Sequence, residues 1–185
     1  MSGTLRPALV LLLGFSVLCG GLYPMAVWGV AQFAFPSKAN GSLIERDGKV
    51  VGSALIGQEF KSDRYFWSRP SAAGDGYDAT SSGGSNLGPT SAKLVERVAA
   101  DIETYGGPRP VPADAVLASA SGLDPHISPA NAARQTARVA QARRLPEARV
   151  AALVAQFTEG RELGILGEPR VNVLALNLAL DALRP

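Results

Sequence analysis

PALVLLLGFSVLCGGLYPMAVWGVAQFAFPS, residues 7–37, is the stretch that decides how this chain is built. Its thirty-one residues carry no charged side chain between Arg6 and Lys38. The hydrocarbon core of a bilayer is about 30 Å thick and needs roughly 20 apolar residues of helix. The stretch therefore predicts a transmembrane helix from Ala8 to about Val30, long enough to cross with tilt to spare.

A cleaved signal peptide is the alternative interpretation of this stretch. The apolar part of a signal peptide spans about 7 to 15 residues and ends in a small-x-small site. The run in this chain is about twice as long, which favours a retained anchor. Cys19 follows Leu18, where a lipoprotein signal has Gly or Ala, so a cysteine that packs within the helix is favoured over a lipid acceptor.

Composition limits what the rest of the chain can do. The roughly 148 residues after Ser37 have an ordinary length for one globular domain. Lys and Arg number 18 against 16 Asp and Glu, so there is no basic excess for nucleic acid. One cysteine and one histidine allow neither a disulfide within the chain nor a clustered zinc site. No metal site is predicted.

The predicted anchor carries small residues but no ionisable group. Ser16 and Gly20 lie four residues apart on one helix face, a spacing that lets another helix approach closely in lipid. The alternative is that glycine is simply frequent in membrane helices. Pro24 predicts a kink. Without an acid, a base or a histidine, the span supplies no ion-binding or proton-relay group. The flanking charges do not decide its orientation.

Turn signals and hydrophobic periodicity predict an α+β domain with a small β-ribbon and four or five helices. The ribbon is a hairpin of residues 42–46 and 49–56 joined by Asp47-Gly48, which accepts positive φ. The predicted helices are 91–105, 113–119, 130–144, 146–157 and 173–183.

Side-chain patterns within these helices predict what they bury. The first is expected to be a core helix. Its apolar stripe consists of Leu94, Val95, Val98 and Ile102. The third helix carries a polar stripe of Arg134, Arg138 and Gln141, which indicates a solvated face. The alternative interpretation is that this stripe binds an acidic surface of a partner. Ser128 and Asn172 are suited to cap the helices that follow them.

Three loop features invite a functional interpretation. An aromatic trio beside an arginine is typical of an interface hot spot, and here it consists of Tyr65, Phe66 and Trp67 with Arg69. Core packing is nevertheless the favoured interpretation. Within the nineteen-residue segment 71–89, backbone amides could cradle an anion, but the phosphate-loop pattern GxxxxGK[ST] is absent and a surface loop is favoured. The weak candidates for such a cradle are Ser82, Gly83, Gly84, Ser85 and Asn86.

The segment Asp124-Pro125-His126 is the only place that suggests nucleophilic catalysis. An acid can orient an imidazole that activates a serine. No GxSxG elbow occurs in the sequence, and a turn whose polar groups satisfy the local backbone is the simpler interpretation. The residues therefore indicate an anchored domain without catalytic residues, acting as a subunit or an assembly factor.

Five motifs together resemble the C subunit of the bacterial Kdp potassium-transporting ATPase. They occur in that family's order over almost the whole chain, after the N-terminal span. The motifs are Gly52-Ser53-x-Leu55-Ile56-Gly57-Gln58, Tyr65-Phe66-x-x-Arg69-Pro70-Ser71-Ala72, Ser81-Ser82-Gly83-Gly84-Ser85-Asn86-Leu87-Gly88-Pro89-Thr90, Ser121-Gly122-Leu123-Asp124-Pro125-His126-Ile127-Ser128-Pro129, and Thr158-Glu159-Gly160-Arg161 with Leu166-Gly167-Glu168-Pro169-Arg170-Val171-Asn172-Val173-Leu174.

The resemblance implies a non-catalytic subunit of a high-affinity potassium pump in the bacterial inner membrane. Its implied partners are a channel-like potassium-binding subunit, a P-type ATPase subunit and a small membrane subunit. Residues 1–36 would form the cytoplasmic N-terminus and span, and residues 37–185 an extracytoplasmic domain. The partner-interface candidates are Ser16, Gly20, Tyr65, Phe66, Trp67, Arg69, Asp124, His126, Arg161, Arg170 and Asn172.

The family subunit is also described as a chaperone that raises the ATP affinity of the hydrolysing subunit. ATP is cytoplasmic, so a domain outside the membrane cannot touch it. An indirect effect through packed subunits is therefore favoured over direct nucleotide binding. Two alternatives from other classes are an anchored hydrolase that uses His126 and an anchored binding or assembly protein that acts outside a pump.

Overall fold

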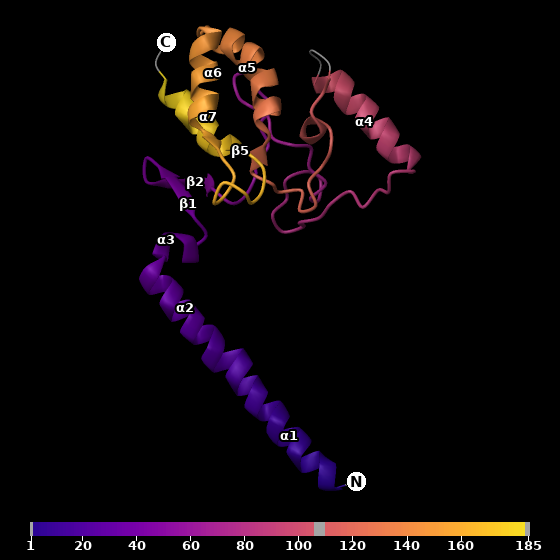
Figure 1. The fold of residues 1–185 in the computed structure, drawn as a ribbon, viewed down its shortest axis with the longest axis vertical. Coiled ribbons are helices and arrows are strands. Elements are labelled where there is room, and N and C mark those ends of the chain that lie inside the picture. The colour runs from indigo at the N-terminus through magenta and orange to yellow at the C-terminus, as the bar shows by residue number, and fades with distance from the viewer. Residues whose placement is uncertain (1, 106–109, 184–185) are drawn as a thin grey trace. The chain divides into compact units, whose positions relative to one another are not determined.

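The computed structural model describes residues 2–105 and 110–183 of the chain (Figure 1). Contacts between residues divide the chain into two compact units, Met1–Val51 and Gly52–Pro185. The first holds the apolar helix, a short helix after it and most of a hairpin, and the second holds the other helices and a three-stranded sheet.

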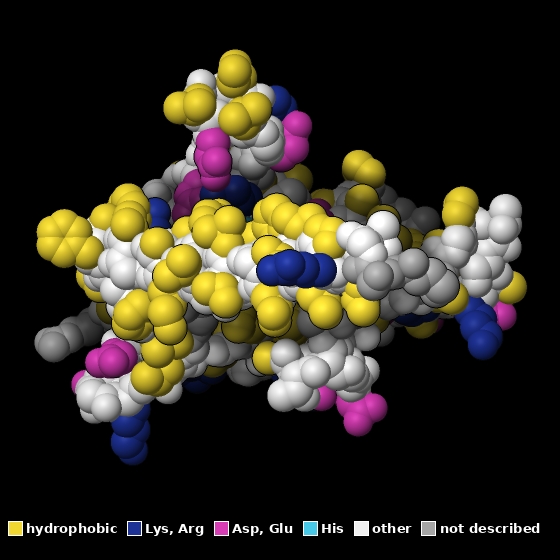
Figure 2. Space-filling model, turned by 90° about the horizontal axis from the view of Figure 1, so that it is seen from below, with side chains coloured by type: hydrophobic (Ala, Val, Ile, Leu, Met, Phe, Trp, Pro, Cys, Tyr) yellow, Lys and Arg dark blue, Asp and Glu magenta, His cyan; other side chains and the backbone are white. Residues whose placement is uncertain are grey.

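The N-terminal unit is dominated by one apolar helical segment. It comprises α1 (Ser2–Val17), the π-helical turn η1 (Leu18–Leu22) and α2 (Tyr23–Ala34). The apolar part runs from Gly3 to Ala34, 32 residues, and none of it is buried within the protein. At 1.5 Å per residue it is about 48 Å long, enough to cross a bilayer. Figure 2 shows hydrophobic side chains gathered over this segment.

Pro24 has a specific local effect on this segment. A proline inside a helix lacks the N–H that bonds to the carbonyl four residues earlier, and its ring crowds that carbonyl. The structure shows a π turn just before it, closed by a bond from the Tyr23 N–H to the Leu18 carbonyl oxygen. A π turn is one of the known ways in which a helix absorbs such a break.

A short helix and a hairpin follow the apolar segment. They are α3 (Pro36–Ala39), β1 (Leu43–Arg46) and β2 (Lys49–Ser53). Asp47 and Gly48 adopt φ of 53° and 72°, which confirms the predicted tight turn. The second strand ends at Ser53 rather than at Ile56, because the Ser53 hydroxyl accepts a bond from the Leu55 N–H and turns the chain.

The second unit is an α+β domain, which confirms the predicted fold class. Its helices are α4 (Ala92–Tyr105), the 3₁₀ turn η2 (Ala113–Ala115), α5 (Pro129–Arg143), α6 (Glu147–Gln156) and α7 (Val173–Ala182). Its strands are β3 (His126–Ile127), β4 (Thr158–Glu159) and β5 (Arg170–Asn172). The antiparallel sheet has the order β3-β5-β4, with Val171 opposite both Ile127 and Thr158.

The hydrophobic core lies between this sheet and helices α5, α6 and α7 (Figure 1). Its largest fully buried apolar side chains are Phe66, Ile127, Leu176, Leu180 and Val139. Predicted caps begin the helices around it, because the Ser128 hydroxyl accepts from the Asn131 N–H and the Asn172 amide oxygen accepts from the Ala175 N–H. Both predicted N-caps are thus confirmed.

Two predictions about the helices are wrong. Helix α4 is not a core helix, because Val95 is 64% exposed and Leu94, Val98 and Ile102 are only half-buried. The Gly- and Ser-rich segment before it offers few apolar side chains to pack against. The helix expected over residues 113–119 is reduced to η2.

The polar stripe of α5 is not a simple solvated face. The Arg138 guanidinium carbon lies 3.7 Å from the centroid of the Trp67 ring, and its nitrogens donate to the carbonyl oxygens of Asp63 and Tyr65. An arginine can bury its stem and stack on an aromatic face while its charge stays solvated. A sequence pattern that records only polarity cannot show this.

Candidate functional site

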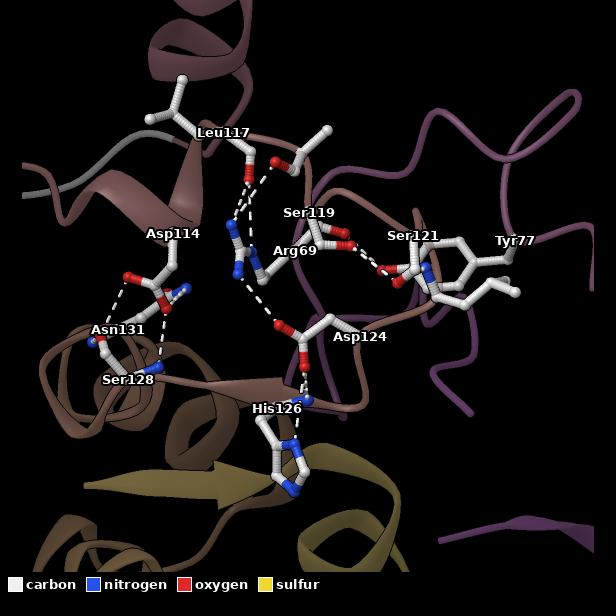
Figure 3. A network of polar contacts seen from close by, with 12 residues as sticks. Arg69, Tyr77, Asp114, Leu117, Ser119, Ser121, Asp124, His126, Ser128 and Asn131 are labelled. Carbon is white, nitrogen blue, oxygen red and sulfur yellow. Dashed lines mark hydrogen bonds and ion pairs between the residues drawn. The ribbon is translucent and has the colours of Figure 1, made fainter. Parts of the chain in front are cut away.

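The candidate site is built around an ion pair between two distant loops. Arg69 Nη1 donates to Asp124 Oδ2 at 2.9 Å, and both side chains are mostly buried (Figure 3). The same guanidinium donates to the carbonyl oxygens of Leu117 and Ala118 at 3.4 Å. Arg69 therefore fixes the loop that leads from η2 to β3.

Asp124 also organises the residues that follow it. Its Oδ1 accepts from the His126 backbone N–H at 3.0 Å and lies 3.5 Å from His126 Nδ1. Burial by itself raises the pKa of Asp124, but hydrogen bonds from His126 and the charge of Arg69 outweigh burial and hold the pKa below its usual value. Asp124 therefore stays a carboxylate with three donors around it.

This geometry supports the turn interpretation of Asp124-Pro125-His126. Among residues 2–105 and 110–183, no serine hydroxyl lies within hydrogen-bond distance of the His126 imidazole. An activated nucleophile needs such a contact. The Asp124 carboxylate instead pairs with Arg69 and accepts from the backbone of its own turn, so these contacts stabilise the turn.

A second carboxylate fixes the start of α5 beside this pair. Asp114 accepts from the Ser128 N–H at 2.7 Å, the Ser128 hydroxyl at 2.9 Å and Asn131 Nδ2 at 3.1 Å (Figure 3). A carboxylate at a helix N-terminus is stabilised by the helix dipole. Ser128 lies 14 residues after Asp114, so no local sequence pattern shows that Asp114 binds the start of this helix.

These groups line a cleft of about 570 Å³. Arg69, Asp124, His126 and Arg170 all lie along it, so the structure brings together four of the predicted interface residues. The remaining cleft lining comes from η2, the turn after it, β3, the N-cap of α5 and the loop before β5, namely Ala113, Asp114, Leu117, Ile127, Ser128, Glu168 and Pro169.

The aromatic trio lies apart from this lining and is held by side-chain amides. Asn177 Oδ1 accepts from the Phe66 N–H at 2.9 Å and its Nδ2 donates to the Phe66 carbonyl at 3.0 Å. Likewise, Gln135 Oε1 accepts from the Trp67 N–H at 2.7 Å, and Gln135 Nε2 donates to the Trp67 carbonyl at 3.1 Å. Phe66 is fully buried, which confirms the core interpretation for this residue. Tyr65 and Trp67 are half-buried.

Arginines cover the two half-buried rings. Arg138 lies over Trp67, and the Arg143 guanidinium carbon lies 4.8 Å from the centroid of the Tyr65 ring. Arg143 Nη2 also pairs with Asp181 Oδ1 at 2.8 Å, and Tyr65 Oη donates to the other carboxylate oxygen. This network ties the aromatic segment to both α5 and α7.

Two of the weak anion-cradle candidates, Ser82 and Gly83, already have hydrogen-bond partners within the domain. The Ser82 hydroxyl and the Gly83 N–H both donate to the Ser121 carbonyl oxygen at 2.9 Å. An ideal Cβ on Gly84 would lie 3.0 Å from the Ala120 carbonyl oxygen. Ser85 is half-buried, and Asn86 is exposed with φ of 52°. The segment closes onto the 120–122 turn and presents no row of free amides at Ser82 and Gly83.

The other predicted interface residues lie elsewhere. Ser16 is in α1 and Gly20 in η1, both exposed. Arg161 pairs with Glu168 at 2.7 Å in the loop between β4 and β5. Asn172 is 8% exposed, and besides capping α7 it donates to the Ala54 carbonyl oxygen at 2.9 Å. Its polar atoms are therefore engaged inside the domain.

Four of the five sequence motifs contact the fifth at residues 121–126, a meeting point that the sequence did not predict. The Gly57 N–H donates to Leu123 O, Arg69 pairs with Asp124, the Gly83 N–H donates to Ser121 O, and the Val173 N–H donates to Pro125 O. The partners are far apart along the chain, so no local pattern could have revealed these contacts.

Fold and site together define a class of protein: one long apolar helix followed in the chain by a small α+β domain, in which ion pairs such as Arg69–Asp124 connect the loops. Comparison with known proteins is more specific. Residues 5–182 match the sequence model of the family KdpC, K+-transporting ATPase, c chain. The chain belongs to this family, which confirms the resemblance seen in its motifs.

Several curated relatives are similar along almost their full length. The Potassium-transporting ATPase KdpC subunit of Gemmatimonas aurantiaca is 62% identical over 184 residues, covering 97% of this chain and 92% of that protein. The subunit of the same name from Rhodospirillum rubrum is 60% identical, covering 98% and 96%. That of Sorangium cellulosum is 56% identical and covers both chains completely.

Proposed function

We propose that this chain is a non-catalytic subunit of an ATP-driven potassium uptake pump, needed to assemble and stabilise the complex. The observation that carries the proposal is the family match over residues 5–182, at up to 62% identity to the relatives named above. The geometry supports it, because the acid–imidazole pair of Asp124 and His126 is engaged by Arg69 and the backbone.

The proposal includes an arrangement in the membrane. The apolar helix crosses the inner membrane once with its N-terminus in the cytoplasm, and the α+β domain lies outside. The helix packs against a channel-like, potassium-binding subunit, and the domain caps the potassium entrance of that subunit. A P-type ATPase subunit and a small membrane subunit complete the pump. The 31 residues between Arg6 and Lys38 carry no charged side chain, which suits a packing role because they offer no group that binds ions.

The proposed effect on ATP is indirect. A domain outside the membrane raises the ATP affinity of the hydrolysing subunit through a coupling free energy between packed subunits. In support, the Ser82 hydroxyl and the Gly83 N–H are used by the Ser121 carbonyl oxygen within the domain. A nucleotide would have to displace those bonds.

A detergent pull-down with the tagged full chain tests the proposal. We expect three companion polypeptides, among them one that is phosphorylated on aspartate. Purification of the chain alone from mild detergent would instead indicate a binding or assembly protein outside a pump. His126→Ala should leave potassium-stimulated ATP hydrolysis intact if the complex still assembles, whereas an anchored hydrolase would lose its activity.

The ATP effect needs its own measurement. ATPase assays on complexes with and without this chain should give a lower KM for ATP when the chain is present. Ser82→Ala should leave that KM unchanged, with Thr80→Ala as the matched control. A rise in KM with Ser82→Ala but not with the control would indicate direct nucleotide contact and contradict the indirect mechanism.

A further inference from the structure

The loop between β4 and β5 exposes three large aliphatic side chains. Leu163 is 88% exposed, Ile165 is 74% exposed and Leu166 is 55% exposed. Single exposed apolar residues are normal on protein surfaces, but adjacent ones mark interaction sites. These three residues, within four positions of one loop, are here named the apolar tip.

The apolar tip is held in one shape. The Glu162 N–H and the Leu166 N–H each donate to the other residue's carbonyl oxygen at 2.9 Å, which closes a tight hairpin. Leu163 at its apex has φ of 53°, a conformation that a leucine rarely adopts. Such conformations persist where the surroundings impose them, and they occur often at binding sites. A rigid apolar surface loses little entropy when it binds.

Ion pairs brace the base of the apolar tip. Arg161 pairs with Glu168 at 2.7 Å, and Arg170 pairs with Glu159 at 2.9 Å and with Glu162 at 3.1 Å. Exposed pairs of this kind contribute little stability. They do fix the charge pattern: three glutamates against two arginines give the rim of the apolar tip one net negative charge.

This charge pattern decides between a lipid surface and a protein. Segments that dip into a bilayer surface carry Lys and Arg, with Trp or Phe on the apolar side, and are drawn to anionic lipid. The apolar tip has aliphatic side chains and an acidic rim, so anionic headgroups would repel it. An apolar pocket bordered by basic side chains on another polypeptide complements it in both respects.

We propose that the apolar tip is a docking element that inserts Leu163, Ile165 and Leu166 into an apolar, basic-rimmed pocket on another polypeptide of the potassium pump. The proposal rests on the function proposed above and adds which surface of the domain makes the contact. The tip is a rigid, preformed anchor, and Arg161 and Arg170 hold it in place from within this chain.

Paired variants test the proposal in the full chain. Leu163→Asn with Ile165→Gln replaces the two most exposed side chains of the apolar tip with residues that tolerate the local backbone, and Val95→Gln removes a comparably exposed side chain from α4 as control. Burying one aliphatic side chain is worth about a tenfold change in affinity or more. We expect the tip variant to dissociate from the detergent-purified pump at least about tenfold faster than wild type, and the control to behave as wild type.

Crosslinking identifies the occupant. In a Cys19→Ala background, Ile165→Cys labelled with a benzophenone maleimide should attach to a larger pump polypeptide, whereas Val95→Cys should not. Attachment to a second copy of this chain, or to lipid in vesicles that contain anionic phospholipid, would overturn the proposal. So would unchanged dissociation of the tip variant from an otherwise intact pump. If wild type brings down no pump polypeptide, the proposed function fails first and this proposal fails with it.

Discussion

The most informative single substitution is Asn177→Leu. Asn177 is 2% exposed in α7, and its side-chain amide pairs with both backbone polar groups of Phe66. This amide does for Phe66 what a neighbouring strand would do in a sheet. Leucine has the same branching and the same number of side-chain heavy atoms as asparagine, so the variant removes two hydrogen bonds without opening a cavity.

The expected loss follows from those two bonds. A buried donor or acceptor without a partner costs about 1–3 kcal/mol, so leaving both groups of Phe66 unpaired costs about 2–6 kcal/mol. This is a large part of the 5–15 kcal/mol that stabilises a typical domain. Gln135 still holds Trp67, so the fold should survive in weakened form. Gln135→Leu should have a similar effect, and the double variant should lose less than the sum, because both amides hold one segment.

Urea unfolding of the full chain in mild detergent measures this loss. The chain has two tryptophans, and Trp28→Phe leaves the fluorescence of Trp67 as the reporter of the aromatic segment. Gln141→Leu on the exposed side of α5 is the control and should stay within about 0.5 kcal/mol of the parent. A loss below about 1 kcal/mol for Asn177→Leu would mean that water satisfies Phe66 and that the amide clamp is not needed.

Three further substitutions test other contacts. Gly122→Ala should destabilise the domain by at least about 1 kcal/mol more than Gly164→Ala, since both have positive φ but only at Gly122 would a Cβ clash, 2.6 Å from the Ala73 N. The pKa of Asp124 is lower in the folded than in the unfolded protein. The ionised carboxylate therefore stabilises the fold fully above the unfolded pKa of about 3.8, and this contribution is lost as the pH falls through the folded pKa. The cost of Asp124→Asn, measured by urea unfolding, should therefore shrink from pH 7 towards pH 2. Burial raises the pKa of Asp101 despite the charge of Arg97, so ionised Asp101 destabilises the fold above its unfolded pKa, and Asp101→Asn should raise the thermal midpoint at pH 7 but not at pH 3.

Local chemistry made most helices and caps predictable. Ser128 followed by Pro129 begins a helix, and Asn172 precedes another, because side-chain oxygens there satisfy free N–H groups. The Asp47-Gly48 turn was predictable for another local reason, because an Asp-Gly pair accepts positive φ. Helix α4 was predicted, but its burial was not predictable, because whether an apolar stripe is buried depends on what packs against it.

The interactions at the candidate site were hidden from the sequence for a different reason. Arg69 and Asp124 were both singled out, yet their pairing spans 55 residues. The amides of Gln135 and Asn177 drew no attention, because a polar residue in a helix usually indicates an exposed face. Their roles depend on the loop that passes beside them, and a single sequence carries no signal for that contact.

The meeting of the motifs at residues 121–126 explains how so little regular sheet can hold the domain together. The three-stranded sheet has strands of two or three residues, too few to fix the long loops on either side. Backbone bonds from Gly57, Gly83 and Val173 to this one segment replace a longer ladder. The Arg69–Asp124 ion pair and the positive φ of Gly122 then hold that segment in a conformation that accepts all three bonds. A change there should disturb several distant loops at once, whereas a change in the apolar tip, which projects from this framework, should disturb binding alone.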